Sequence, residues 1–257
     1  KKFSNVNYIM NLRKLIIKEI TMKKLISALF ASLCLVTFQV PAQSADVSFS
    51  IGLAGNQGGY HARGTETIAD ADDVKGNNTA TVTSEAGVFE DSHPSVFLEV
   101  NIGDNMTVGA EFAMSDIQTP TNTNARLDKL TSNGDGDVTP TQGNNTAKAS
   151  FSDKNTVYIQ ARLLGGLYSK IMYHNVNVVT EESLATGGSY PDTTLEGLGI
   201  GMGYQHDFDD LGIFVRAEVT ASGYEDAKAV NANDVNKVIT VDSIYGAEGS
   251  IRIGKTF

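Results

Sequence analysis

The stretch LGIFVRAEVTAS, residues 211–222, decides the fold class. Apolar side chains occupy every second position, which is the period of a β-strand with two different faces. One face is aliphatic or small throughout: Ile213, Val215, Ala217, Val219 and Ala221. The other face carries Arg216 and Glu218 at its centre. We therefore predict a strand whose two faces meet different surroundings.

The same alternation recurs in seven other segments, and a sustained period of 3.6 residues is almost absent. These segments are approximately 46–60, 94–102, 106–115, 154–164, 167–179, 195–206 and 242–257. The segment 167–179 is less regular than the rest, and there we expect a β-bulge near Asn175 that changes which residues face each side.

The connections between these segments alternate between short and long. The short ones, 103–105, 165–166 and 207–210, are of hairpin length and contain turn-forming residues. The long ones are polar: 61–92, 116–153, 180–193 and 223–241. Long structureless loops are uncommon in compact soluble domains, but they are usual on one side of an outer-membrane barrel. Residues 46–257 therefore predict an all-β, eight-stranded antiparallel up-and-down transmembrane β-barrel with short periplasmic turns and long external loops.

The charges on the non-aliphatic faces distinguish this barrel from a soluble sheet. Four acids and four bases fall there: Glu99, Glu111, Arg162, Lys170, Arg216, Glu218, Glu248 and Arg252. A barrel of eight strands is too narrow for bulk water, so inward charges must be paired. We expect these residues to form ion pairs in the lumen, with Glu218–Arg252 and Glu111–Arg162 as the first candidates.

The opposite orientation would make the chain a soluble periplasmic β-domain that acts as a binding module. The aliphatic faces would then form a core and the charges would lie in water. A balanced set of charges would be a coincidence in so acidic a chain, and nothing in the sequence supplies a second layer to cover the aliphatic faces.

Composition excludes several other classes. The chain has 257 residues and a formal net charge of −10, which argues against binding nucleic acid through its phosphates. Its one cysteine, Cys34, cannot form an internal disulfide framework or a cysteine zinc cluster. The hydrophobic fraction of 41% is too high for a disordered chain.

Residues 22–45 have the pattern of a secretory signal peptide: two lysines, an apolar run and then small residues. The apolar run is shorter than a membrane-spanning helix and is interrupted by polar residues. Residues 1–21 are treated as an upstream extension. Without residues 1–45 the chain keeps 13 basic and 29 acidic residues, a net charge of −16. We expect export to the cell outer membrane.

Two motifs suggest small ligands, but neither has the full pattern of a binding loop. Glycines occupy alternate positions from Gly197 to Gly203, without the spacing of a nucleotide-binding loop; we expect them to make room for bulky neighbours such as Phe214 or Tyr158. The run from Asn133 to Asp137 resembles the start of a calcium loop but lacks the later ligands. No metal site and no cofactor are predicted.

An enzymatic role would centre on His93, which lies beside Ser92 and Ser95 at the expected level of the outer membrane edge. No acidic partner completes a catalytic set, so no catalytic residue is predicted. Aromatic residues are expected at both membrane edges: Tyr168, Tyr204, Phe208 and Phe257 at one, and Tyr60, Tyr173 and Tyr245 at the other.

The last nine residues read GSIRIGKTF, an alternating strand that closes on an aromatic residue. Ile251, Ile253 and Phe257 match the terminal strand of the outer-membrane β-barrel family, whereas Lys255 departs from it. With the signal peptide and the eight segments, the chain resembles small eight-stranded barrels of the outer-membrane-protein-A-like or surface-antigen type. The resemblance implies that the barrel assembly machinery reads this terminal strand.

Three functions are consistent with this sequence. The first is a structural or surface-interaction role, in adhesion or envelope integrity, with outer-membrane lipid, lipopolysaccharide and an extracellular ligand as partners. The second is a small-solute pore, and the third is the soluble binding module. The four long connections hold 18 acidic and 7 basic residues, which indicates a solvated repulsive surface or cation bridging to lipopolysaccharide.

Overall fold

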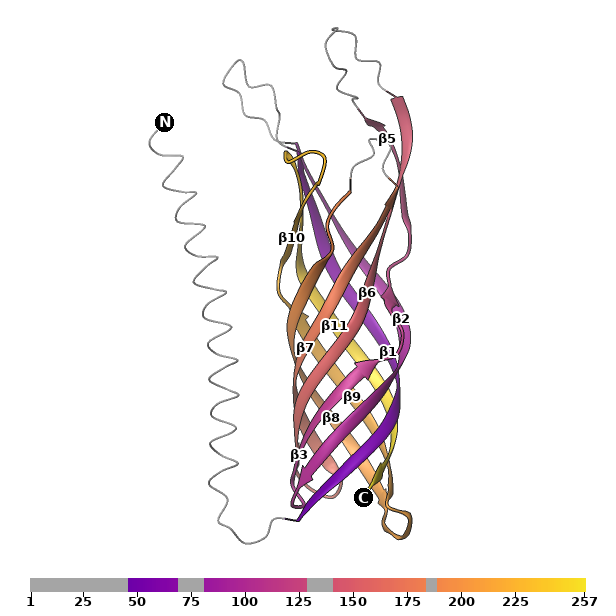
Figure 1. Ribbon diagram of the computed structural model, residues 1–257, viewed down its shortest axis with the longest axis vertical. Helices are drawn as coiled ribbons and strands as arrows, with labels where there is room; N and C mark the ends of the chain where they lie inside the picture. The colour runs from indigo at the N-terminus through magenta and orange to yellow at the C-terminus, as the bar shows by residue number, and fades with distance from the viewer. Residues whose placement is uncertain (1–45, 69–80, 129–140, 184–188) are drawn as a thin grey trace, which may run out of the picture. The chain divides into compact units, whose positions relative to one another are not determined.

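A computed structural model describes residues 46–68, 81–128, 141–183 and 189–257, and it contains a single antiparallel sheet (Figure 1). Eight of the described strands form its ring: β1 (Val47–Ile68), β2 (Thr81–Ile102), β3 (Met106–Ala113), β6 (Thr141–Arg162), β7 (Leu167–Ser183), β8 (Thr193–Phe208), β9 (Ile213–Tyr224) and β11 (Lys237–Thr256). Three short strands lie outside the ring: β4 (Ile117–Gln118), β5 (Asn122–Asp128) and β10 (Ala227–Val230).

The ring is closed because β1 pairs with β2 on one edge and with β11 on the other. The β1–β11 register runs from Ser50 opposite Thr256 to Ile68 opposite Lys237. The backbones of Phe49 and Phe257 exchange two further hydrogen bonds at the end of this seam. Every ring strand therefore has two neighbours, which confirms the predicted eight-stranded up-and-down barrel.

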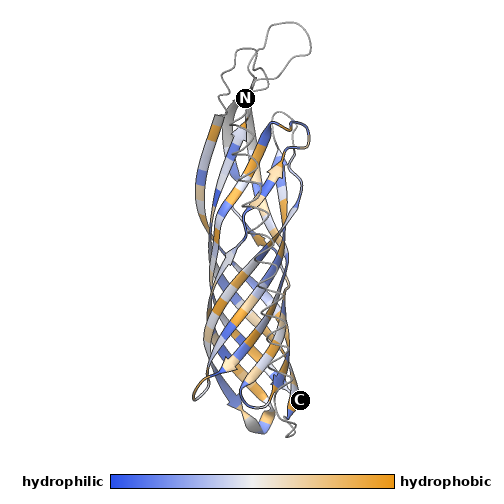
Figure 2. Ribbon diagram, turned by 90° about the vertical axis from the view of Figure 1, so that its left-hand side faces the viewer, coloured by the Kyte–Doolittle hydropathy of each residue, from blue (hydrophilic) through white to orange (hydrophobic). Residues whose placement is uncertain are grey.

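The outer face of the ring is a belt of exposed aliphatic side chains. Apolar and polar residues alternate along each strand of the lower barrel in Figure 2. The exposed large residues include Ile51, Leu53, Leu98, Phe112, Ile171, Leu198, Ile200, Met202, Val219, Ile251 and Ile253. So large a continuous apolar surface is not stable in water, and a closed ring leaves no unpaired backbone groups to face lipid. The fold is that of a transmembrane β-barrel.

The short connections are tight turns at one end of the barrel. Gly103 follows β2 with a φ of 59°, and Gly165 and Gly166 precede β7 with φ of 55° and 91°. Positive φ is tolerated by glycine because it has no Cβ. The third connection is a 3-10 helix, η1 (Asp209–Leu211), followed by Gly212 with a φ of 64°. The third turn therefore lies two residues later than the predicted 207–210.

The long connections are not structureless, so that expectation was wrong for their described parts. β1 and β2 stay paired as far as Ile68 opposite Thr81. β5 and β6 pair from Asn122 opposite Ala147, and β10 pairs with β11. These segments are polar in composition, but they are rich in Thr and Val, which favour extended backbone. Pairing therefore continues well beyond the apolar belt.

The expected bulge near Asn175 was also wrong. Even-numbered residues of β7 stay buried from Tyr168 to Val178, so its alternation does not change. The irregularity lies on the neighbouring strand, where the β6–β7 register shifts between Ser152 and Asn155. Asp153 has a φ of 49° at this point, and the extra residue belongs to β6.

Alternate glycines of β8 do face inward and make room for large side chains, although the neighbours differ from those expected. A Cβ on Gly203 would collide with Tyr168, and a Cβ on Gly197 would collide with Tyr224. Phe214 packs instead against Gly254, and Tyr158 packs against Gly109. Gly109, Gly197, Gly203 and Gly254 thus lie where an aromatic ring packs against the strand.

Two tyrosines assigned to the membrane edges face the interior instead. Tyr168 and Tyr60 are buried because each shares the parity of the inward residues of its strand. Tyr204, Phe208, Tyr245 and Phe257 are exposed on the outside, as edge residues require.

Residues 1–21, the signal segment 22–45 with Cys34, and Asn133 to Asp137 lie outside the described residues. In the part of the chain that the structure describes, no helix is both long enough and apolar enough to cross a membrane.

Substitution of Ile200 by Arg tests the outward orientation of the belt. Ile200 is 67% exposed on β8. An arginine facing lipid near the bilayer midplane costs about 2–4 kcal/mol, so we expect a large fall in the free energy of unfolding in lipid vesicles, measured by urea titration. The matched control is Val235→Arg in the connection before β11, where a change within about 0.5 kcal/mol is expected. Equal effects at both positions would contradict a lipid-facing belt and favour the soluble β-domain.

Candidate functional site

The barrel interior holds a buried network of charges, and its first pair joins opposite walls. Arg216 of β9 forms a two-pronged ion pair with Glu99 of β2, whose Nη2–Oε2 distance is 2.9 Å. The Tyr158 hydroxyl of β6 donates to the same carboxylate at 2.7 Å. All three side chains are almost completely buried. Such a bidentate, charge-assisted pair is strong and geometrically specific.

A second group of charges continues the network around the lumen. Arg252 of β11 lies between two acids, 2.7 Å from Glu111 and 2.9 Å from Glu218. Lys170 of β7 lies 2.9 Å from the second oxygen of Glu218. The Tyr168 hydroxyl donates to that oxygen at 2.8 Å. Strands from every side of the ring thus meet in one set of contacts.

The network is balanced in charge, which is the condition for its burial. Its acids are Glu99, Glu111 and Glu218, and its bases are Lys170, Arg216 and Arg252. Removing an ion from water costs several kcal/mol, and only close partners and hydrogen bonds offset that cost. Aromatic rings add cation–π contacts: Arg216 lies 4.2 Å from the centroid of Phe214, and Lys170 lies 3.9 Å from that of Tyr158.

Glu248 belongs to a separate pair nearer the long-loop end. Its partner is Lys154 of β6, and the Tyr60 hydroxyl donates to the same carboxylate at 2.7 Å. Lys154 was missing from the predicted set although it is the first residue of the predicted segment 154–164 and has the inward parity of Tyr158 and Gln160. The signal that could have located Lys154 was Glu248, an inward-facing glutamate for which the predicted set held no base at the same height in the barrel.

The predicted contact between Glu111 and Arg162 is not formed. Glu111 lies opposite Thr156 in the β3–β6 register, and Arg162 is six residues further along β6. Six residues of strand span about 20 Å, so the two side chains cannot meet. Arg162 instead lies 3.1 Å from Asp207 at the short-turn end, where both are partly exposed.

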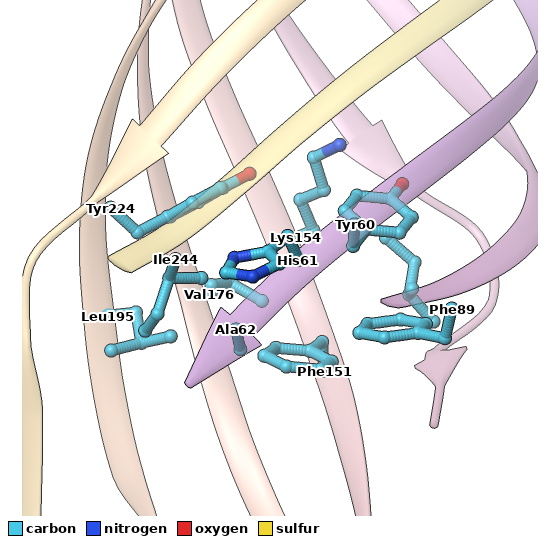
Figure 3. Close-up of a pocket in the computed structure, with 11 residues that line it drawn as sticks. Tyr60, His61, Ala62, Phe89, Phe151, Lys154, Val176, Leu195, Tyr224 and Ile244 are labelled. Carbon is cyan, nitrogen blue, oxygen red and sulfur yellow. The ribbon is translucent and has the colours of Figure 1, made fainter. Parts of the chain in front are cut away.

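Above the charges, towards the long loops, the interior becomes apolar. Val176, Val178, Leu195 and Ile244 form a buried cluster. Figure 3 shows the neighbouring side chains, among which the rings of Tyr60, Phe89 and Phe151 stack with centroids 5.1 and 5.8 Å apart. They leave a cavity of about 30 Å³. This section of the interior is filled by side chains.

His93 and His174 lie in a closed part of the interior. His93 is buried and its Nδ1 atom has no hydrogen-bond partner, while Ser95 donates to Glu111 rather than to His93. His174 bonds Thr156 and Ser222 at 2.8 and 2.9 Å, but the adjoining cavity is only about 10 Å³. Nor does the described part of the chain hold a cluster of three or more side chains that would bind a metal.

The three residues of the expected assembly motif lie on the outside of the closing seam. Ile251, Ile253 and Phe257 are all exposed on or just after β11. The Lys255 ammonium, which departs from the family pattern, lies 5.5 Å from the ring centroid of Phe257.

Comparisons with known proteins concern the fold alone. No protein-family model matches the chain, and no curated protein matches its sequence. Among solved structures, Neisserial surface protein A is 11% identical over 82% of this chain and 99% of its own, with a TM-score of 0.36. The outer membrane protein AlkL is 11% identical over 85% and 95%, with a TM-score of 0.41. The Escherichia coli outer membrane protease OmpT is 9% identical over 84% and 99%, with a TM-score of 0.37.

Removing one member of the Glu99–Arg216 pair is expected to be costly. Arg216→Met leaves a buried carboxylate without its counter-ion, which typically costs 3–5 kcal/mol, so we expect a loss of about that size in the urea-derived free energy of unfolding. Adding Glu99→Gln is expected to give a double variant that loses less than the sum of the two single losses.

The control for the Arg216 and Glu99 substitutions is the same experiment with Arg63→Met and Asp242→Asn. Arg63 donates to both oxygens of Asp242 at 2.8 Å beyond the belt, where these hydrogen bonds hold the pKa of Asp242 below its usual range. This pair is exposed to solvent, and exposed pairs contribute little. Additive losses at Glu99 and Arg216 would contradict direct coupling between them.

A matched pair of glycines tests how tightly the interior is packed. A Cβ on Gly203 would lie 2.6 Å from the Ala217 carbonyl oxygen and against the Tyr168 ring, whereas Gly249 has nothing within 4 Å of that position. Gly203→Ala should therefore lower the free energy of unfolding by about 1–3 kcal/mol, and Gly249→Ala should not. A neutral Gly203→Ala in the same urea titration would mean that Tyr168 can move aside freely.

Proposed function

We propose that the chain is an outer-membrane β-barrel with a structural or surface-interaction role, in envelope integrity or adhesion, and with a lumen closed to solutes. The observation that carries this proposal is the network of Glu99, Glu111, Lys170, Arg216, Glu218 and Arg252. Each of these six residues is at least nine-tenths buried. A solute crossing the lumen would have to separate these partners and leave charges unpaired in a narrow interior.

The apolar section supports closure independently. It lies on the long-loop side of the charges, and its remaining cavity of about 30 Å³ is the size of a few water molecules at most. A polar solute entering from that side would meet stacked aromatic rings before it reached the network. Because the ionic section and the apolar section both block the lumen, they favour a structural role over a pore.

The paired extensions beyond the belt support a role at the cell surface. β1 and β2 continue as a hairpin, and β5 and β10 widen the sheet at the same end. We infer that this end is external and that its acidic residues either repel neighbouring surfaces or bind lipopolysaccharide through divalent cations. An extracellular ligand would meet these hairpins first.

Several assignments belong to the same proposal. Residues 22–45 would direct export as a signal peptide, and the barrel assembly machinery would read Ile251, Ile253 and Phe257. The protein would be neither an enzyme nor a nucleic-acid-binding protein. The proposal that the protein is not an enzyme is supported by the buried Ser222–His174–Thr156 contacts, which adjoin no cavity large enough for a substrate.

Conductance in a planar lipid bilayer tests closure against the pore alternative. We expect the refolded protein to give no stable current steps, because the charged and apolar sections both block the lumen. The double variant Glu99→Ala/Arg216→Ala removes the pair that joins opposite walls, and we expect it to give brief openings.

The control for the conductance measurement is Arg63→Ala/Asp242→Ala, a pair on β1 and β11 beyond the belt. This variant should give no current steps. Folding of each variant is followed by the change in gel mobility on boiling. Stable open-pore steps from the unaltered protein would refute the closed lumen and favour a small-solute pore.

A further inference from the structure

A polar cavity of about 380 Å³ occupies the short-turn end of the barrel. We call it the turn-end vestibule. Asn105 of the β2–β3 turn and Gly212 of the β8–β9 connection lie at its rim, and Arg216 of the ionic network lies at its inner end. Its volume is within the range of about 300–1,000 Å³ that is usual for small-molecule sites. The closed-lumen function makes no use of it.

One side chain of the vestibule is incompletely satisfied. Gln160 of β6 is 3% exposed, yet its Oε1 atom has no hydrogen-bond partner. In the described part of the chain only one other buried side-chain atom shares this property, His93 Nδ1, which adjoins a cavity of about 10 Å³. A buried polar group without a partner costs about 1–3 kcal/mol. Gln160 lines a space large enough to hold a partner.

The buried charges of the vestibule are compensated by protein groups, and Asp104 of the β2–β3 turn adds one exposed acid to its lining. Arg162 lies 3.1 Å from Asp207, and Arg216 is paired with Glu99. The Arg216 Nε also donates to Gln205 at 2.6 Å. These pairs leave little unbalanced charge in the buried part of the cavity, around Gln160, so that part favours a neutral ligand.

Much of the remaining wall consists of hydroxyl and amide groups that both donate and accept. Thr107 donates to Asn101 at 2.9 Å, and Asn101 donates to Ser50 at 2.8 Å. Beneath them the ring of Phe214 adds an apolar surface. A sugar ring has the complementary chemistry, with hydroxyls around its edge and carbon–hydrogen groups on its faces.

We propose that the turn-end vestibule binds a neutral saccharide of one or two rings, with a sugar hydroxyl bonded to the Gln160 amide. A hydroxyl satisfies this amide in either orientation, because it can donate to the oxygen or accept from the nitrogen. The protein would then hold a sugar on the side of its short turns while its lumen stays closed.

The test titrates the refolded barrel with maltose and follows its backbone amide signals by NMR in micelles. We expect saturable shifts in the vestibule, at residues such as Thr107 and Gly212. Gln160→Met keeps the side-chain length and removes the hydrogen bond, so it should weaken binding about tenfold. The matched control is Gln57→Met on the exposed face of β1, which should bind maltose as the unaltered protein does.

Several outcomes would overturn the proposal. The vestibule holds water only if no saturable shifts appear even well above millimolar maltose. The same conclusion follows if Gln160→Met binds maltose with the affinity of the unaltered protein. Tighter binding of gluconate or glucosamine than of glucose would refute a neutral ligand. If Gln160→Met fails to fold, the titration of the unaltered protein tests the proposal by itself. Maltose-dependent shifts confined to the paired extensions beyond the belt, rather than in the vestibule, would contradict it. A folded, non-conducting barrel that binds no sugar would end this inference and leave the closed-lumen function untouched.

Discussion

Charge compensation inside a narrow ring is the constraint on which the rest of this structure depends. Within the apolar belt, a single sheet closed on itself has one face for lipid and one for the lumen, so a charged side chain there has only the lumen. Arg252 shows the consequence, since it contacts Glu111 and Glu218 from two other strands. The barrel can hold the six charges of this network because their partners come from other strands rather than from adjacent sequence positions.

The interior changes character along its axis, and each section limits what the barrel can do. The short-turn end is polar and open, the middle is ionic, and the long-loop end is apolar with stacked rings. An ion is disfavoured in the apolar section and an apolar molecule is disfavoured in the ionic one. This order separates the two ends chemically, so binding at one end need not involve passage to the other.

Alternation along a strand is a local property, and the sequence therefore predicted correctly which face the regular strands turn to the lumen; β7, where a bulge was expected near Asn175, is the exception. What failed depended on contacts between strands. The pairing of Glu111 with Arg162 required the β3–β6 register, which no single segment contains. Lys154 was missed although its parity is inward, because its partner Glu248 lies on β11 and only the fold brings the two together. The paired extensions beyond the belt were predicted as loops because their polar composition was given more weight than their threonines and valines. Tyr168 was predicted as a membrane-edge residue, although it has the same parity as the inward-facing Lys170.

The seam between β1 and β11 has a consequence for how the barrel forms. The Ser50 and Thr256 hydroxyls are 2.9 Å apart although 206 positions separate them in sequence. Contacts of such sequence separation form slowly, because a long chain must be ordered before they contribute. Until β11 arrives, β1 keeps an unpaired edge that can join a strand of another molecule. The period between synthesis of the first strand and pairing of the last is therefore when this chain is most prone to aggregate.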